Sequence, residues 1–100
     1  MKVFIAESSI IFCSPNGTEV VTSVQVGQPR QEDKLKWACD VEIPGVDRPR
    51  TIHGADSLHA LILAIGYLSD RLEHLVSNGG SILSPNNRKP AAINDILPRI

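Results

Sequence analysis

Residues 35–43 alternate between large apolar side chains and side chains that are polar or small, and this pattern constrains the fold more than any other feature of the chain. The apolar positions are Leu35, Trp37, Cys39, Val41 and Ile43. The intervening positions are Lys36, Ala38, Asp40 and Glu42. Successive side chains of a β-strand point to opposite faces of a sheet. The segment therefore predicts an antiparallel strand with one face in a core and the other in water.

Two further apolar segments, residues 3–13 and 19–27, precede this strand. Between them lies Asn16-Gly17, a dipeptide whose residues tolerate the positive φ of a tight hairpin turn. The polar segment GQPRQED, residues 27–33, is expected to be a connection rather than a strand. After a second turn sequence, a short fourth strand is expected at residues 50–53. The first half of the chain thus predicts four antiparallel strands.

Residues 57–77 predict a long amphipathic helix, because their apolar side chains recur at helical spacing. These side chains are Leu58, Leu61, Ile62, Ile65, Leu68, Leu72, Leu75 and Val76. Asn78-Gly79-Gly80 is typical of a helix end. At about 1.5 Å per residue the helix is roughly 30 Å long, which matches the length of a nine-residue strand. We therefore predict an α+β fold, a four-stranded antiparallel sheet covered on one face by one long helix (ββββα).

The chain of 100 residues is long enough for one domain. We assign residues 1–80 to a single α+β domain and residues 81–100 to a C-terminal tail. In the tail, helical spacing relates Ile93, Ile96, Leu97 and Ile100. One prediction is a short helix that docks on the sheet edge or on a second subunit. The alternative is a partly ordered tail.

Composition weighs against several classes of partner. The net charge is −1 and only 4% of the residues are aromatic, which argues against nucleic-acid binding. The longest apolar run, residues 60–68, is too short to span a membrane. The N-terminal apolar segment is interrupted by Glu7 and lacks a small-residue cleavage site, so we expect no signal peptide. Cys13 and Cys39 are predicted to be reduced core residues of a cytoplasmic protein.

The stretch Gly54-Ala55-Asp56-Ser57-Leu58 resembles the attachment signature of acyl carrier proteins, in which the serine bears a phosphopantetheine arm. That resemblance implies a bundle of helices, whereas the residues before Gly54 are predicted to form strands. With one residue removed, the stretch also resembles the Gly-Asp-Ser-Leu signature of a family of serine esterases. Such an esterase needs a distant Asp-x-x-His pair, but the Asp-x-x-His of this chain, Asp56 and His59, straddles the serine itself. We therefore expect no catalytic residue, no cofactor and no enzyme activity.

Asp56 has a structural role in the same stretch. A helix begins with backbone N–H groups that lack partners, and an aspartate at the N-cap position can accept a hydrogen bond from one of them. Its negative charge also suits the positive end of the helix dipole. We predict that Asp56 is the helix cap, that Ser57 takes the first helical position, and that replacing Asp56 by Ala costs about 1 kcal/mol.

Two sets of residues are candidates for binding. A second face of the helix is apolar and unusually small, and it predicts an interaction surface composed of Ala60, Leu63, Ala64, Gly66 and Tyr67. Glycine inside a helix costs about 1 kcal/mol relative to alanine, which suggests close approach by the tail or by a partner at Gly66. The alternative is a ligand site formed by His53 and His59 at the strand-to-helix corner. The chain has no close-spaced Cys or His motif, so we expect no metal.

Trp37-Ala38-Cys39 on the alternating strand, together with residues 54–61 at the start of the helix, resembles a group of small uncharacterised bacterial proteins. The resemblance spans roughly residues 35–76 and implies a fold without an assigned activity. Our functional hypothesis is a non-enzymatic protein–protein interaction module. It would act as a homodimer or as an accessory or immunity-type partner of another bacterial protein. The alternative is a domain that binds a small ligand or a metal at the strand-to-helix corner.

Overall fold

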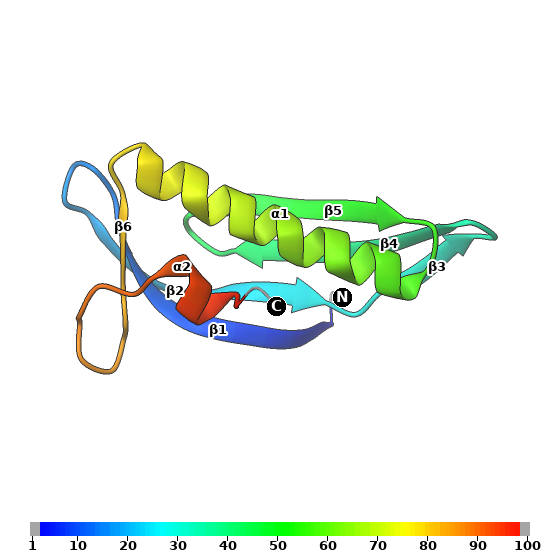
Figure 1. The fold of residues 1–100 in the computed structure, drawn as a ribbon, viewed down its shortest axis with the longest axis horizontal. Coiled ribbons are helices and arrows are strands. Elements are labelled where there is room, and N and C mark those ends of the chain that lie inside the picture. Colours follow the sequence, from blue (N-terminus) through cyan, green and yellow to red (C-terminus); the bar gives the residue numbers. More distant parts are fainter. Residues whose placement is uncertain (1–2, 99–100) are drawn as a thin grey trace.

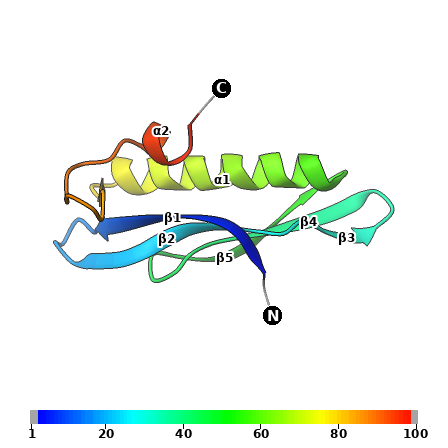
Figure 2. The ribbon, with the colours of Figure 1, turned by 90° about the horizontal axis from the view of Figure 1, so that it is seen from below.

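The computed structural model describes residues 3–98, which form one antiparallel sheet with a long helix packed on one face (Figures 1 and 2). The strands are β1 (Phe4–Cys13), β2 (Glu19–Gly27), β3 (Arg30–Asp33), β4 (Lys36–Ile43), β5 (Asp47–Gly54) and β6 (Ser81–Leu83). The helices are α1 (Ser57–Ser77) and α2 (Ile93–Ile96). The predicted α+β class, with an antiparallel sheet and one main helix, is confirmed.

The strand count was predicted as four, but the described residues form six strands. β3 occupies most of the segment that was expected to be a connection. β2 and β3 pair one after the other with the same edge of β4, through Val26 opposite Val41 and Arg30 opposite Ala38. All residues of β3 are polar and exposed, so the strand has no hydrophobic period that sequence reasoning could detect.

β6 is the second strand that the sequence pattern did not reveal. Its three residues pair with β1 over Ile11–Cys13, on the edge opposite β2. The order across the sheet is therefore β6, β1, β2 with β3, β4 and β5. Ile82 in β6 is 3% exposed and belongs to the core, so the core includes the first residues of the C-terminal tail. Residues 99–100 of that tail, including Ile100, lie outside the described residues.

The core lies between α1 and the sheet face that α1 covers; we call the opposite face the outer face. The core residues are Ile10, Phe12, Val24, Val26, Cys39, Val41, Ile43, Ala60, Ala64, Leu68, Leu72 and Ile82. Figure 1 shows α1 running along β4 and β5, and α1 makes most of its sheet contacts with these two strands. The β1–β2 half of the covered face is therefore only partly shielded by α1.

The rotation of α1 differs from the sequence prediction. Leu58, Ile62 and Ile65 were predicted to face the core, but their side chains are 63%, 57% and 37% exposed. Ala60 and Ala64 are completely buried instead. Both faces of the helix are apolar, so periodicity alone could not choose between them. The smaller alanines allow the helix backbone to approach β4 and β5 more closely, and the strand-to-helix corner described below fixes this orientation.

After β6 the chain turns back and places α2 on the same side of the sheet as α1 (Figure 2). The apolar residues Ile93, Ile96 and Leu97 are half-buried against the core. α2 has no fully buried residue, so it is a light covering rather than part of the central core. None of the helices in residues 3–98 combines the length and the apolar character needed to cross a membrane.

Candidate functional site

The strand-to-helix corner contains the sequence that resembled carrier and esterase signatures. A Cβ placed on Gly54 would lie 2.5 Å from the backbone nitrogen of Ala60, so β5 can approach α1 here only through a glycine. Asp56 is the N-cap residue of α1, and its carboxylate accepts a 2.8 Å hydrogen bond from the backbone N–H of His59. The His59 Nδ1 atom in turn accepts a 2.9 Å hydrogen bond from the backbone N–H of Ala55. These polar groups therefore build the helix start.

Ser57 is the exposed first residue of α1. The antiparallel sheet around it differs from both scaffolds that the signatures imply. The carrier signature implies a bundle of helices, and the esterase signature implies a parallel sheet. The corner thus matches those families in residue types and not in architecture.

The two histidines of the alternative ligand site have different partners. The Nε2 atom of His53 lies 3.0 Å from Glu32 Oε1 on β3. His59 is hydrogen-bonded to the backbone of Ala55, as described above. Among residues 3–98, no group of three or more His, Cys, Asp or Glu side chains is arranged to hold a metal ion. His53 and His59 are thus hydrogen-bonded to different groups, Glu32 and the backbone of Ala55.

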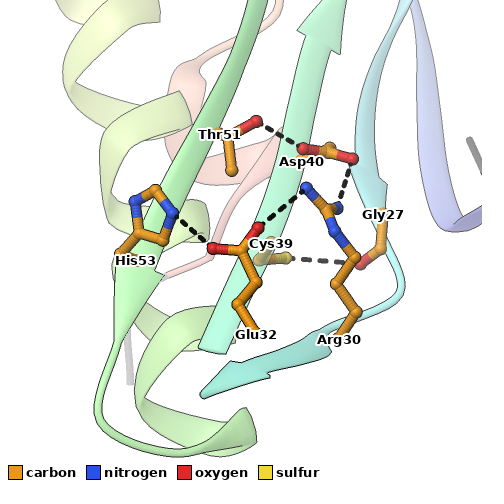
Figure 3. Close-up of polar contacts among 7 residues, drawn as sticks. All are labelled: Gly27, Arg30, Glu32, Cys39, Asp40, Thr51 and His53. Carbon is orange, nitrogen blue, oxygen red and sulfur yellow. Dashed lines mark hydrogen bonds and ion pairs between the residues drawn. The ribbon is translucent and has the colours of Figure 1, made fainter. Parts of the chain in front are cut away.

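His53 belongs instead to a polar network on the outer face (Figure 3). Its centre is Asp40, whose side chain is only 10% exposed. The carboxylate of Asp40 accepts hydrogen bonds from Arg30 Nη1 at 2.7 Å and from Thr51 Oγ1 at 2.6 Å. The hydrogen bond that Arg30 donates to Asp40 raises the pKa of the Arg30 guanidinium. Because these residues come from β3, β4 and β5, the network fastens the short strand β3 to the sheet.

Cys39 lies beneath this network and is completely buried. Its thiol lies 3.3 Å from the carbonyl oxygen of Gly27 and donates a hydrogen bond to it (Figure 3). Burial raises the pKa of the Cys39 thiol, because desolvation disfavours the thiolate. Cys13 is half-buried, and neither cysteine forms a disulfide. A neutral buried thiol is a poor nucleophile, so Cys39 serves packing.

The predicted interaction face of α1 is divided by the structure. Ala60 and Ala64 are inside the core, and Tyr67 packs against it with its hydroxyl 3.3 Å from Asp47 on β5. Ala60 and Ala64 are therefore not available to a partner, and Tyr67 is only partly exposed. Leu63 is 41% exposed, and Gly66 is exposed, with no described atom beyond the adjacent backbone of its own helix within 4 Å of its Cβ position. The glycine therefore does not mark a close contact with the described tail.

A hollow of about 180 Å³ lies where α1 leaves the β1–β2 half of the sheet partly uncovered. We call it the β1–α1 groove. It is lined by Ala6, Glu7, Ser8, Val24, Val26, Ile65, Leu68, Ile96 and Leu97. All but two of these side chains are apolar, and Ile65 connects the hollow to the exposed side of α1. The groove is thus an apolar concavity that reaches the surface.

A model of the family described as Domain of unknown function (DUF6968) matches residues 11–86. The chain belongs to this family. Searches of curated proteins and of solved structures gave no match. The DUF6968 region begins within β1 and ends after β6, so it includes the strand-to-helix corner and the outer-face network. It agrees with the resemblance to a family without an assigned activity, and it leaves residues 4–10 of β1 and all of α2 outside the match.

Proposed function

We propose that the chain is a non-enzymatic protein–protein interaction module that binds its partner along the exposed side of α1 and the adjoining β1–α1 groove. The observation that carries the proposal is the strip formed by Leu58, Ile62 and Ile65. These residues are spaced i, i+4 and i+7, so they lie on one side of the helix. Large aliphatic side chains that remain exposed together are typical of interaction surfaces.

The polar side chains best suited to catalysis or ligand binding already stabilise the fold, which also supports an interaction role. Asp56 and His59 cap the helix, and Asp40 is paired with Arg30. The hydrogen bonds of His53 and His59 weigh against the alternative of a small-ligand or metal site at the corner. The partner is either a second copy of this chain or another bacterial protein. We also propose a cytoplasmic setting, which the two free cysteines support.

Site-specific photo-crosslinking in cells of the source organism tests the proposal. A photoreactive amino acid at position 62 should form an adduct with a protein partner, whereas the same group at position 21 should not. Val21 is a suitable control because it is an aliphatic residue, 78% exposed, on β2. Val21 pairs with Ile11, whose sequence neighbours Ile10 and Phe12 point into the core. Because side chains alternate along a strand, Ile11 and Val21 point to the outer face, away from α1.

The matched substitutions are Ile62→Glu and Val21→Glu. Ile62→Glu should abolish the complex and Val21→Glu should leave it intact, with both variants retaining the thermal unfolding transition of a folded domain. Equal loss of binding in the two variants, or no adduct at position 62, would contradict the proposal.

A further inference from the structure

We infer that the partner binds this chain by displacing α2, and that it does so with an amphipathic helix that carries basic residues beside its apolar side. The inference rests on the proposed function, because it names the kind of partner that the β1–α1 groove accepts. α2 and the residue after it form one wall of that groove through Ile96 and Leu97. Ile93, Ile96 and Leu97 recur at i, i+3 and i+4, the spacing of one helical side. α2 therefore shows which apolar pattern the groove accepts.

The tail is tied to the sheet as far as Ala91, whose backbone N–H donates a 2.9 Å hydrogen bond to the carbonyl of Ile82 on β6. α2 follows, with four residues, no fully buried residue and an N-cap residue, Ala92, that offers no side-chain acceptor. Helices of this length depend on packing, and here three half-buried side chains must offset the loss of backbone freedom. The DUF6968 match ends at residue 86, before α2. α2 can therefore leave the groove while the sheet and α1 stay folded.

The packing around α2 is incomplete. The β1–α1 groove, with a volume of about 180 Å³, stays open beside α2, and a second hollow of about 280 Å³ is lined by α1 together with Leu97 and Pro98. Ser69 lines the second hollow, and its hydroxyl is buried without a hydrogen-bond partner among the described residues. Buried polar groups in folded proteins are normally paired. The present cover thus leaves space that a longer helix can fill and a hydroxyl that its polar side chains can pair.

The charge of this surface specifies a basic partner. Asp70 lines the second hollow, and Glu73, also exposed, lies one helical turn from Ser69 and Asp70. The arginine of α1, Arg71, lies 3.2 Å from Asp47 on β5 and so does not neutralise them. α2 brings no cation to this surface, because its charged residue is an aspartate. α2 therefore matches the groove in apolar pattern and not in charge, whereas lysine or arginine beside the apolar side of a partner helix complements it.

Amide hydrogen exchange of the unmodified protein, followed by NMR, tests whether α2 detaches on its own. The Leu97 N–H donates to the carbonyl of Ile93 at the end of α2, whereas Leu68 belongs to the core side of α1. The Leu97 amide should exchange at least about 100-fold faster than the Leu68 amide, because local opening costs less than global unfolding. Equal exchange rates would show that α2 opens only with the whole domain, and would overturn the inference without affecting the proposed function.

Leu97→Asp distinguishes displacement of α2 from direct contact with it. A charge in place of this half-buried side chain should release α2, so the partner no longer has to displace it. The adduct yield of the photoreactive group at position 62 should then rise severalfold. Asn86→Asp is the matched control, because it adds the same charge in the exposed turn before α2 and should leave the yield unchanged. A lower yield for Leu97→Asp would mean that the partner binds to α2, and an unchanged yield that α2 is not involved; both would overturn the inference.

Strengthening α2 should have the opposite effect on the same adduct. Ala92 is the N-cap residue of α2, and Ala92→Ser supplies the side-chain acceptor that the first turn lacks. A more stable α2 competes better for the groove, so the adduct yield at position 62 should fall severalfold. Ala92 is exposed, so this variant should fold and keep the thermal unfolding transition of the wild type. A yield that stays the same or rises would contradict competition between α2 and the partner.

Asp70→Lys tests the charge of the partner. Asp70 is exposed and takes part in no ion pair among the described residues, so the variant should fold, and its adduct yield should fall severalfold. An unchanged yield would overturn the basic partner. So would an adduct of twice the 10.9 kDa chain mass, because neither described helix of this chain carries more basic than acidic residues. The proposed function would survive both results. No adduct in any variant would contradict the proposed function and the inference with it.

Discussion

Gly54→Ala should strongly destabilise the protein, because the new methyl group meets backbone rather than a flexible side chain. Its Cβ would lie 2.5 Å from Ala60 N and 2.9 Å from the carbonyl carbon of His59. Ordinary contact begins at 3.4 Å, so the first turn of α1 must move away from β5 by about 0.9 Å, the difference between 3.4 and 2.5 Å. Overpacking of this kind costs about 1–3 kcal/mol. Weakening the hydrogen bonds of Asp56 and His59 adds about 1 kcal/mol.

We therefore expect Gly54→Ala to lower the free energy of unfolding by about 2–4 kcal/mol, a large share of the 5–15 kcal/mol typical of a domain. For a chain of this size, each kcal/mol shifts Tm by roughly 4–8 °C. Gly66→Ala is the matched control, because the same methyl group meets no described atom within 4 Å. It should raise stability by about 0.5–1 kcal/mol by removing a helical glycine.

Urea denaturation followed by circular dichroism, with thermal melts as a second measurement, compares the two variants. Opposite signs are the expected result. A Gly54→Ala variant whose free energy of unfolding lies within about 1 kcal/mol of the wild-type value would refute the close approach at this corner. Equal shifts in both variants would refute the assignment of Gly66 to open space.

Three further predictions concern single side chains. Asp56→Ala should lower the free energy of unfolding by about 1 kcal/mol through loss of the helix cap, and Asp56→Asn should retain most of it in the same denaturation assay. Arg30→Ala should lower the free energy of unfolding by about 1–2 kcal/mol, less than the loss of a fully buried ion pair, because the Arg30 side chain is 48% exposed. Glu32→Ala should lower it by less, since the Glu32 carboxylate lies 3.8 Å from the Arg30 guanidinium. Equal losses of stability in the two variants would contradict the central place of Asp40 in the network. Burial raises the pKa of the Cys39 thiol, so as the pH rises past the ordinary pKa of a cysteine only the unfolded chain ionises it, and the free energy of unfolding should decrease with rising pH. Iodoacetamide should also label Cys13 faster than Cys39 in the folded protein, and equal labelling rates would contradict the burial of Cys39.

The fold class followed from two periodic patterns, the alternation of residues 35–43 and the helical repeat of residues 57–77. Periodic patterns of this kind are visible in a single sequence. The prediction that β4 has one face in water was wrong, because residues 38–41 are all buried, and Leu35, which was expected on the core face, is 81% exposed. β3 was missed because Arg30 and Glu32 face water and bind other strands through charge. β6 was missed because a three-residue strand is too short to show a period. Elements with a long hydrophobic face could be predicted from it, whereas β5, which lacks one, was expected over residues 50–53 only and extends over Asp47–Gly54.

The site was harder to predict than the fold, because the helix offers two apolar faces. Sequence reasoning assigned Leu58, Ile62 and Ile65 to the core from their helical spacing, and it assigned Ala60 and Ala64 to a second face covered by the tail or by a partner. In the N-terminal half of α1 the structure shows the opposite arrangement, with the alanines buried and the larger side chains exposed. The outer-face network was equally hidden, because Arg30, Asp40 and Thr51 are distant in sequence and meet only after three strands have paired.

The strand-to-helix corner explains why the helix buries its alanines, and this explanation bears on function. Gly54 brings β5 against the backbone of Ala60, so Ala60 must face the sheet, and helical spacing then takes Ala64 and Leu68 inward as well. With the rotation fixed at the first turn, Leu58 and Ile62 must lie outside the core. Polar side chains at these positions would be compatible with the same fold, since the corner and the buried side chains of α1 set the orientation. Their aliphatic character is therefore not required by folding, and this is the reason for proposing an interaction surface on α1.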